Sequence, residues 1–215
     1  MAEVSREPKF IEVYKNNGDL HRQTAAILTG KPTEEITKEE RQQAKAVNFG
    51  FLYGMGAEKF KEKAKNDYNV DLSLKEAIKI RELFFKAYPV LNAYLDRVGQ
   101  TALYNQKIRN LAGRTVNFDQ GQEPWKYANL GRNTPIQSLN ADIIKTAMAS
   151  LYTEFKTGGV KLVNVVHDEL VFEVPNEYAE QAAIIVKEGM EAAGGKYLKT
   201  VPCKVETVVG KSWQK

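Results

Sequence analysis

Four side chains that could hold a nucleotide recur every four residues near the start of the chain: Arg41, Lys45, Phe49 and Tyr53. On an α-helix each such step advances about 400°, so successive members drift by only about 40° and form one stripe. Cations bind polyphosphates, and aromatic rings stack on bases. The spacing favours one extended nucleotide along a helix face, but an ordinary amphipathic helix with a solvated basic face has the same pattern.

A second polar group interrupts an apolar, β-branched run over residues 163–174. His167, Asp168 and Glu169 stand in its middle, which predicts a hairpin with this trio at the bend. Two carboxylates at a tight turn supply oxygen ligands of the kind that magnesium and manganese bind. The competing interpretation is a solvent-exposed hairpin tip without a metal, because acidic residues are common in turns.

The helix that carries the first group has local signals at both ends. Thr37 and Glu40 form a T-x-x-E capping box, so the helix is expected to begin after Thr37. Gly54 favours either a helix end or the close approach of another group. Three apolar residues fall off the cation stripe and are expected to face the core: Val47, Phe51 and Leu52.

The remaining sequence predicts two regions. The first has helices over about residues 10–105, with a second capping box at Ser73 and Glu76, and then a hairpin over 108–118. A loop over 119–124 separates the regions. The second has a helical pattern from Ile136 to Phe155, the hairpin with the polar trio, a helix capped by Asn176, and a last strand over 201–209.

These elements predict an α+β fold. Residues 1–118 form a mostly helical region with a hairpin near 108–118, and residues 119–215 form part of an antiparallel sheet with packed helices. An incomplete sheet leaves an unpaired edge, which needs a partner strand.

Composition bounds the class of protein. The 215 residues are 43% hydrophobic, which is enough for a sizeable core, and the net charge of +4 permits nucleic-acid binding without indicating it. Cys203 is the only cysteine, so no internal disulfide can form, and a reducing cytosol is expected. No apolar run is long enough to span a membrane, and the charged N-terminus does not fit a signal peptide.

Four segments together resemble one family. Residues 45–54, KAVNFGFLYG, resemble the motif B helix of the family-A DNA polymerases, the bacterial DNA polymerase I family. Residues 166–169, VHDE, resemble its motif C. Residues 133–142 resemble its N-x-P-x-Q-x-x-x-A-D segment, and residues 18–25 its D-x-H-x-x-T-A segment. Four motifs in the family's order are far more specific than any one of them.

The resemblance implies an incomplete active site. Residues 1–118 would be the fingers and residues 119–215 the C-terminal part of the palm. The family carries its first catalytic aspartate in motif A, D-Y-S-Q-I-E-L-R, and residues 2–11 resemble the segment just after it. The motif A aspartate and the thumb would therefore come from a second, N-terminal polypeptide, and the chain would be active only with that partner.

The resemblance implies that five residues contact the incoming dNTP. Lys45 resembles the lysine that contacts the phosphates and protonates the leaving pyrophosphate. Arg41 and His21 match residues that also grip the phosphates. Phe49 would lie beside the sugar, and Tyr53 would occupy the templating position when the fingers are open.

The implied chemistry is template-directed transfer of a dNMP to a primer 3′-hydroxyl with two Mg²⁺ ions. Asp168 would bind metal, and the motif A aspartate would complete the second site. Glu169 would support the metal site or the primer, and His167 would touch the primer end.

DNA contacts are implied for Asn133 and Gln137, as minor-groove readers near the primer terminus, and for Arg114 on the hairpin. At Asn129 the family usually has arginine, which leaves the duplex contacts there open. Taken alone, Asn133 and Gln137 would equally suit helix capping around Pro135.

Two other functions stay open. A non-catalytic, polymerase-derived module would bind primer-template only; the missing motif A favours it, and the retained Asp168 opposes it. A phage-type single-subunit RNA polymerase would share the fold, but the HDE trio resembles the DNA enzymes. In each case the expected location is the cytoplasm of a bacterial cell or of a phage-infected host.

Overall fold

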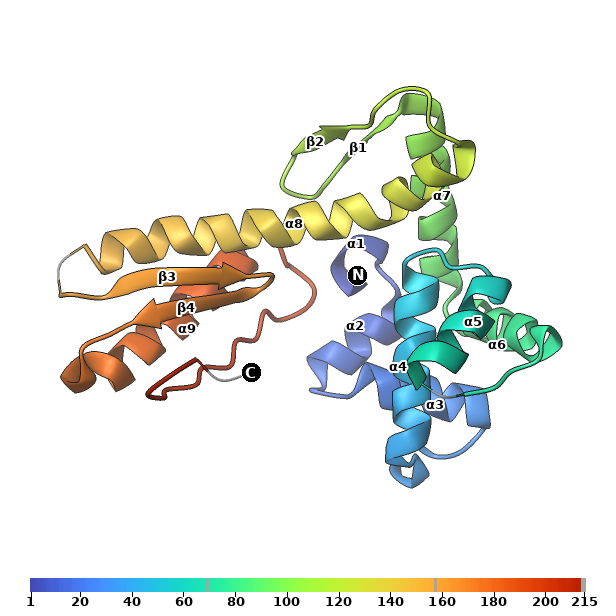
Figure 1. Cartoon of the computed structure of the whole chain (residues 1–215), viewed down its shortest axis with the longest axis horizontal. Coiled ribbons are helices and arrows are strands. Elements are labelled where there is room, and N and C mark those ends of the chain that lie inside the picture. Colours follow the sequence, from blue (N-terminus) through green and yellow to red (C-terminus); the bar gives the residue numbers. More distant parts are fainter. Residues whose placement is uncertain (69, 157, 214–215) are drawn as a thin grey trace. The chain divides into compact units, whose positions relative to one another are not determined.

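The computed structural model describes residues 1–68, 70–156 and 158–213, which are mostly helical with two small hairpins (Figure 1). The chain divides into two compact units. We call Met1–Arg109 with Thr115–Pro135 the N-terminal unit, and Asn110–Arg114 with Ile136–Lys215 the C-terminal unit.

Helices dominate the N-terminal unit. Its elements are α1 (Ala2–Ser5), α2 (Pro8–Lys15), α3 (Leu20–Thr29), the 3-10 helix η1 (Thr33–Glu35), α4 (Lys38–Leu52), α5 (Ala57–Tyr68), α6 (Leu74–Ala87), α7 (Pro89–Asn105), β1 (Lys107–Arg109) and β2 (Thr115–Asn117). Helix α8 (Pro124–Glu154) contributes to both units. The C-terminal unit continues with β3 (Lys161–Val166), β4 (Glu169–Glu173), the 3-10 helix η2 (Asn176–Tyr178) and α9 (Ala179–Gly195).

Both predicted capping boxes are confirmed. The Glu40 N–H donates to Thr37 Oγ1 at 3.2 Å, and the Thr37 N–H donates back to Glu40 Oε2 at 2.9 Å. Ser73 and Glu76 make the same reciprocal pair at the start of α6. Helix α4 ends at Leu52, and Gly54 follows with a left-handed φ of 78°. These helix ends form as predicted because their hydrogen bonds join residues only three apart.

An aromatic core holds α4 in place. Phe51 is fully buried, and its ring centroid lies 4.7 Å from that of Phe60 and 5.5 Å from that of Phe84. Val47 is buried as predicted, whereas Leu52 is only partly buried. Burying a phenylalanine side chain contributes about 1.5–3 kcal/mol. Because the face of α4 that carries Phe51 and Val47 packs in the core, the opposite face of this helix lies at the surface.

A buried carboxylate ties the start of the chain to α7. Glu7 accepts hydrogen bonds from the N–H groups of Val90 and Leu91, at 3.1 and 3.0 Å, in the first turn of that helix. A carboxylate suits this place because the first N–H groups of a helix lack partners and carry partial positive charge.

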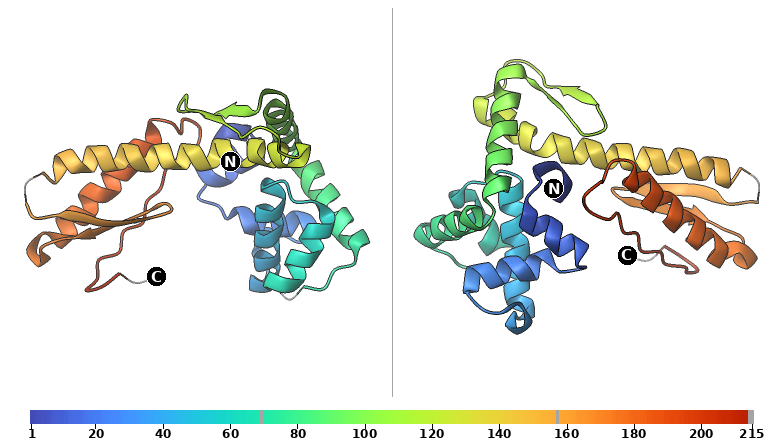
Figure 2. Two further views of the ribbon diagram at one scale, coloured as in Figure 1. Left: turned by 45° about the horizontal axis from the view of Figure 1, so that its top comes forward. Right: turned by 180° about the vertical axis from the view of Figure 1, so that it is seen from behind.

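In the C-terminal unit, a two-stranded antiparallel hairpin packs on helices. Val165 pairs with Leu170 and Val166 with Glu169, so the predicted hairpin is present and His167 and Asp168 form its turn. Glu169, which was predicted to share the bend, is the first residue of β4. Leu170 and Phe172 pack against a buried cluster: Leu151, Phe155, Val160, Ala182 and Val186. Figure 2 shows α9 lying along the hairpin when the chain is seen from behind. These contacts bury one face of β4.

Strand β3 is much more exposed than β4. The side chains of Val163 and Val165 are 54% and 40% exposed. Among the described residues, β3 and β4 pair only with each other, so both outer edges carry unpaired backbone groups. The fold is mostly helical with small antiparallel sheets, which confirms the predicted α+β fold in this coarse form.

The predicted strand over residues 201–209 is wrong. This segment forms no ladder; instead the Val205 N–H donates to the Glu191 carboxylate of α9 at 3.1 Å. The β-branched composition favours an extended chain, but a strand also needs a neighbouring strand, and here a helix side chain accepts the hydrogen bond.

Two predicted helix starts are also wrong. Asn176 does not cap α9, because residues 176–178 form a 3-10 turn and the helix begins at Ala179 without a side-chain cap. Helix α8 begins at Pro124 and continues through Pro135. Asn133 and Gln137 therefore lie inside α8, and the capping interpretation of these two residues fails.

Candidate nucleotide and metal sites

The predicted stripe on α4 exists and lies at the surface. Arg41 and Lys45 are partly buried, and Phe49 and Tyr53 are 42% and 36% exposed. The centroids of the Phe49 and Tyr53 rings lie 6.4 Å apart, and their planes differ by only 11°. The stripe thus offers two nearly parallel ring faces beyond two cations, which suits a base and its phosphates.

Helix α3 brings His21 to this stripe. Its ring centroid lies 5.8 Å from that of Phe49. Asp19 caps α3 by accepting from the N–H groups of His21 at 2.9 Å and Arg22 at 3.1 Å, and it also pairs with Arg41. Partial burial raises the pKa of the Asp19 carboxyl, but the hydrogen bonds from Arg41 and the backbone outweigh burial and lower it overall.

A buried hydrogen-bonded chain lies behind His21. Its Nδ1 is 2.8 Å from Asn48 Nδ2, Thr24 Oγ1 donates to Asn48 Oδ1 at 3.0 Å, and Thr24 Oγ1 is 3.0 Å from the Tyr88 hydroxyl. The sequence pattern does not identify Thr24, Asn48 and Tyr88 as a group. Thr24 and Asn48 stand inside two of the quoted motifs, but nothing in the sequence pattern connects Tyr88 to them.

In the C-terminal unit, the hairpin turn presents the polar trio. His167 has a φ of 55°, in the left-handed region, and both His167 and Asp168 are exposed. Glu169 is partly buried, and its Oε1 accepts from the indole N–H of Trp213 at 2.8 Å. The carboxylates of Asp168 and Glu169 thus stand at the end of the hairpin.

The donor atoms at this turn fit magnesium, because hard cations bind carboxylate oxygens. Within residues 1–68, 70–156 and 158–213, however, no group of three or more His, Cys, Asp or Glu side chains is placed to hold a metal ion.

The predicted DNA contacts differ in their surroundings. Gln137 is exposed on α8. Asn133 is partly buried, and its Oδ1 atom is buried without a hydrogen-bond partner among the described residues. Arg114 binds Asp142 in a two-pronged contact, with Nε 2.8 Å and Nη2 2.5 Å from Oδ1. The proposed roles of Asn133, Gln137 and Arg114 in DNA binding stay predictions.

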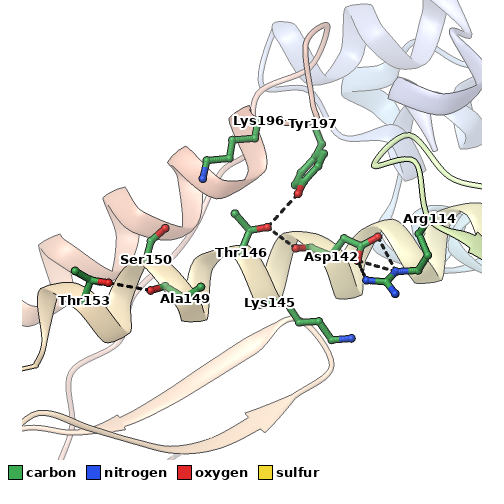
Figure 3. A pocket seen from close by; sticks show the side chains of 9 residues that line it. All are labelled: Arg114, Asp142, Lys145, Thr146, Ala149, Ser150, Thr153, Lys196 and Tyr197. Carbon is green, nitrogen blue, oxygen red and sulfur yellow. Dashed lines mark hydrogen bonds and ion pairs between the residues drawn. The ribbon is translucent and has the colours of Figure 1, made fainter.

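Arg114 and Asp142 also line an open pocket of about 560 Å³ in the C-terminal unit (Figure 3). Lys145, Thr146 and Tyr197 line it as well, and the Tyr197 hydroxyl lies 3.1 Å from Thr146 Oγ1. The Arg114 guanidinium, helped by the Asn110 amide, holds the pKa of the Asp142 carboxyl below its usual range. Asp142 thus stays ionised and remains paired with Arg114.

Comparison with known proteins decides the family. A profile described as DNA polymerase family A matches residues 1–215, the whole chain. The chain belongs to this family. It is 38% identical over 218 residues to DNA polymerase I of Aquifex aeolicus, and 34% identical over 223 residues to the thermostable DNA polymerase I of Thermus filiformis.

These matches cover the chain almost completely but only part of each relative. They include 100% and 99% of this chain, but 37% of the Aquifex protein and 25% of the Thermus protein. A solved structure of the POL domain of Pol1 from M. smegmatis, in complex with DNA primer-template and dNTP, is also similar. It has a TM-score of 0.79 and 28% identity, over 94% of this chain and 35% of that one.

The structure groups the predicted residues in two places. His21 and the α4 stripe lie in the N-terminal unit, and the hairpin trio lies in the C-terminal unit. The division falls at Pro135, with the hairpin tip Asn110–Arg114 in the C-terminal unit, whereas the predicted boundary was at residues 118 and 119. The fingers and palm assignments stay predictions.

None of the helices in the described part of the chain is long and apolar enough to cross a membrane.

Proposed function

We propose that this chain forms the fingers and the C-terminal part of the palm of a family-A DNA polymerase. Its reaction would be template-directed transfer of a dNMP to a primer 3′-hydroxyl. The observation that carries the proposal is the α4 stripe with His21 beside it, because it offers phosphate ligands and ring faces in the order that a nucleotide needs. The match of the whole chain to this family favours DNA synthesis over the RNA polymerase alternative.

In the N-terminal unit, each residue of the stripe has a distinct task. Arg41 and Lys45 bind the triphosphate, and His21 adds a hydrogen bond to it. Lys45 protonates the pyrophosphate as it leaves. Phe49 packs beside the sugar, and Tyr53 fills the templating position until the template base enters. Binding to Arg41 requires the phosphates to compete with Asp19, which pairs with Arg41 in this structure.

In the C-terminal unit, Asp168 holds the metal, with Glu169 beside it, and His167 contacts the primer end. Two Mg²⁺ ions, when bound, stabilise the attacking and leaving oxygens. The 215 residues contain no D-Y-S-Q-I-E-L-R motif, so we assign the second carboxylate to a polypeptide segment that carries motif A and the thumb. The exposed valines of β3 offer that segment an apolar strand to pack against.

Primer-template is the second partner. Asn133 and Gln137 read the minor groove near the primer terminus, and Arg114 adds a cation on the hairpin. The similar structure of the M. smegmatis protein contains DNA primer-template and dNTP. We carry these ligands over to this chain as part of the proposal, together with a cytoplasmic location.

Primer extension tests the proposal. This chain, a polypeptide carrying the thumb and motif A, and their mixture are assayed separately with Mg²⁺ and all four dNTPs. We expect extension only in the mixture, because one carboxylate site cannot hold both metal ions. Robust extension by this chain alone would contradict the shared site, and failure of the mixture despite a stable complex would contradict the catalytic role.

A non-catalytic module is the second candidate. The absence of a three-ligand metal cluster among the described residues favours it. This candidate predicts that the mixture binds primer-template as tightly as an active polymerase does but incorporates no nucleotide at any Mg²⁺ concentration.

A further inference from the structure

The hydrogen-bonded chain behind His21 runs through the core of the N-terminal unit. Thr24 and Tyr88 are fully buried, and Asn48 is 1% exposed. The chain links three helix segments, because Thr24 lies on α3, Asn48 on α4, and Tyr88 ends α6. Buried polar groups need partners, so each polar side-chain group of this chain must have at least one.

The direction of the chain follows from its buried end. Thr24 Oγ1 is the hydrogen-bond partner that the Tyr88 hydroxyl has among the described residues. The phenol must therefore donate to Thr24, or its O–H would be buried without an acceptor. Thr24 then donates its own hydrogen to Asn48 Oδ1, and the Asn48 amide N–H donates to His21 Nδ1.

The opposite direction leaves one group unsatisfied. Turning the Asn48 amide around would let His21 Nδ1–H donate to Asn48, Asn48 to Thr24, and Thr24 to Tyr88. The Tyr88 O–H would then lack an acceptor at a fully buried position. Leaving a buried donor unpaired costs about 1–3 kcal/mol, so the first direction dominates.

We propose that Asn48 and Thr24, the latter accepting from Tyr88, are positioning residues that keep His21 neutral, with its proton on Nε2. Because Nδ1 accepts from Asn48, only Nε2 can carry the proton. A second proton on Nδ1 would face the Asn48 N–H, so the chain opposes protonation. His21 then presents one N–H donor on the side of the ring away from the core.

The charges around His21 agree with this assignment. Burial lowers the pKa of His21; Asp19 on α3 opposes this effect, and Arg41 and Lys45 on α4 add to it. The net pKa lies below the usual value for histidine, so the neutral form dominates at neutral pH.

The consequence for nucleotide binding rests on the proposed function. A neutral His21 donates one hydrogen bond to a phosphate oxygen and leaves the charge to Arg41 and Lys45. His21 then adds no pH dependence to dNTP affinity in the range near pH 6.5 in which an ordinary histidine titrates, and the terminal phosphate of the dNTP, which titrates in a similar range, remains as its source. Without the chain, His21 would gain charge in that range and affinity would depend more steeply on pH.

Nitrogen-15 NMR of the histidine rings tests the proposal without any activity. The protein has only two histidines, and His21→Gln assigns the His21 signals. We expect an unprotonated Nδ1 and a protonated Nε2 at pH 7. A protonated Nδ1 in the parent protein would overturn the proposal directly, so the test does not depend on a variant that folds.

Variants then test each link. Thr24→Val should give a mixture of His21 tautomers, because the donor to Asn48 Oδ1 is lost. Tyr88→Phe should keep the single tautomer, because the buried Thr24 O–H still has Asn48 Oδ1 as its acceptor. Thr24→Ser should restore the single tautomer. Asn48→Asp should reverse the bond, since a carboxylate accepts from Nδ1–H, and raise the His21 pKa by about one unit or more. Tyr94→Phe, which removes another buried phenol of the same unit, should leave His21 unchanged. An unchanged tautomer in Thr24→Val and Asn48→Asp, both folded, would refute the positioning role.

A binding measurement separates this proposal from the proposed function. The affinity of the assembled complex for dNTP is followed from pH 5.5 to 8 in the parent protein and in Asn48→Asp. Steeper pH dependence in the variant supports both proposals. If the tautomer is as expected but dNTP does not bind, the positioning role stands and the polymerase role of this site fails.

Discussion

In the N-terminal unit, two side chains proposed to bind the nucleotide, Arg41 and His21, have partners inside the same unit, whereas the hairpin turn of the C-terminal unit is exposed to solvent. Arg41 pairs with Asp19, and His21 rests on a buried hydrogen-bonded chain. His167 and Asp168 are exposed, and β3 beside them shows apolar side chains. A substitution at a buried residue distant from the nucleotide can therefore impair the site in the N-terminal unit. A substitution in the exposed turn can abolish its chemistry without unfolding the protein.

The largest expected effect is the loss of chemistry at the turn. Asp168→Asn in the assembled polymerase should lower the rate of nucleotide incorporation by more than about 100-fold. Replacing a residue that only hydrogen-bonds to a metal ligand already lowers metal affinity or activity by about 10–100-fold, and Asp168 is proposed to be a ligand itself. Stability and primer-template binding should stay the same, since Asp168 is exposed. Single-turnover extension, urea unfolding and DNA binding measure these effects. Glu188→Gln on α9 is the matched exposed control. Incorporation within tenfold of the parent would remove Asp168 from the metal site.

Packing in the N-terminal unit should be sensitive far from the stripe. A Cβ added at Gly131 on α8 would lie 2.4 Å from the Val98 carbonyl oxygen on α7. Gly131→Ala should lower the free energy of unfolding by about 1–3 kcal/mol, because a backbone atom cannot easily move aside. Urea denaturation measures the change. Gly56→Ala, where a Cβ would meet nothing within 4 Å, is the control. Equal stability of the two variants would show that α7 and α8 can move apart without a loss of folding free energy.

The Arg114–Asp142 pair is the exception in the C-terminal unit, because it has internal partners. Asp142→Asn should destabilise the protein by about 1–3 kcal/mol at pH 7. The pKa of Asp142 is lowered in the folded state, so its stabilisation is complete above the unfolded pKa near 4 and disappears as the pH falls through the folded pKa. Unfolding at pH 7 and pH 3 should therefore show a shrinking difference between parent and variant. Asp119→Asn, in an exposed loop, serves as control. A difference that persists unchanged at low pH would argue against the ion pair.

The smallest effect concerns the stripe itself. Phe49→Tyr should increase the use of dideoxynucleotides relative to deoxynucleotides by about tenfold, because a phenol could replace a hydrogen bond lost with the sugar's 3′-hydroxyl. Competition between the two substrates on one template measures the ratio. Tyr53→Phe, one turn along the helix, is the control. An unchanged ratio would mean that Phe49 does not face the sugar, and the order of groups along α4 would need revision.

Features whose hydrogen bonds join near neighbours were predictable from the sequence. The capping boxes at Thr37 and Ser73 join residues three apart, and the turn at His167 and Asp168 lies between two apolar runs. The stripe on α4 follows from helical geometry alone. Membership in the family was also predictable, because the sequence contains four motifs in the family's order. The family profile matches residues 1–215 and confirms it.

Features that depend on distant partners were decided only by the tertiary structure. Residues 201–209 have the composition of a strand, but within the described part of the chain no strand pairs with them to complete a ladder. Pro135 looked like a helix start, yet α8 already extends from Pro124 and tolerates the one hydrogen bond that proline removes. The proposed tautomer of His21 depends on Asn48, 27 residues beyond it, and on Thr24, which donates to Asn48. Sequence spacing determines which residues share a helix face, but only packing determines which buried donor meets which acceptor.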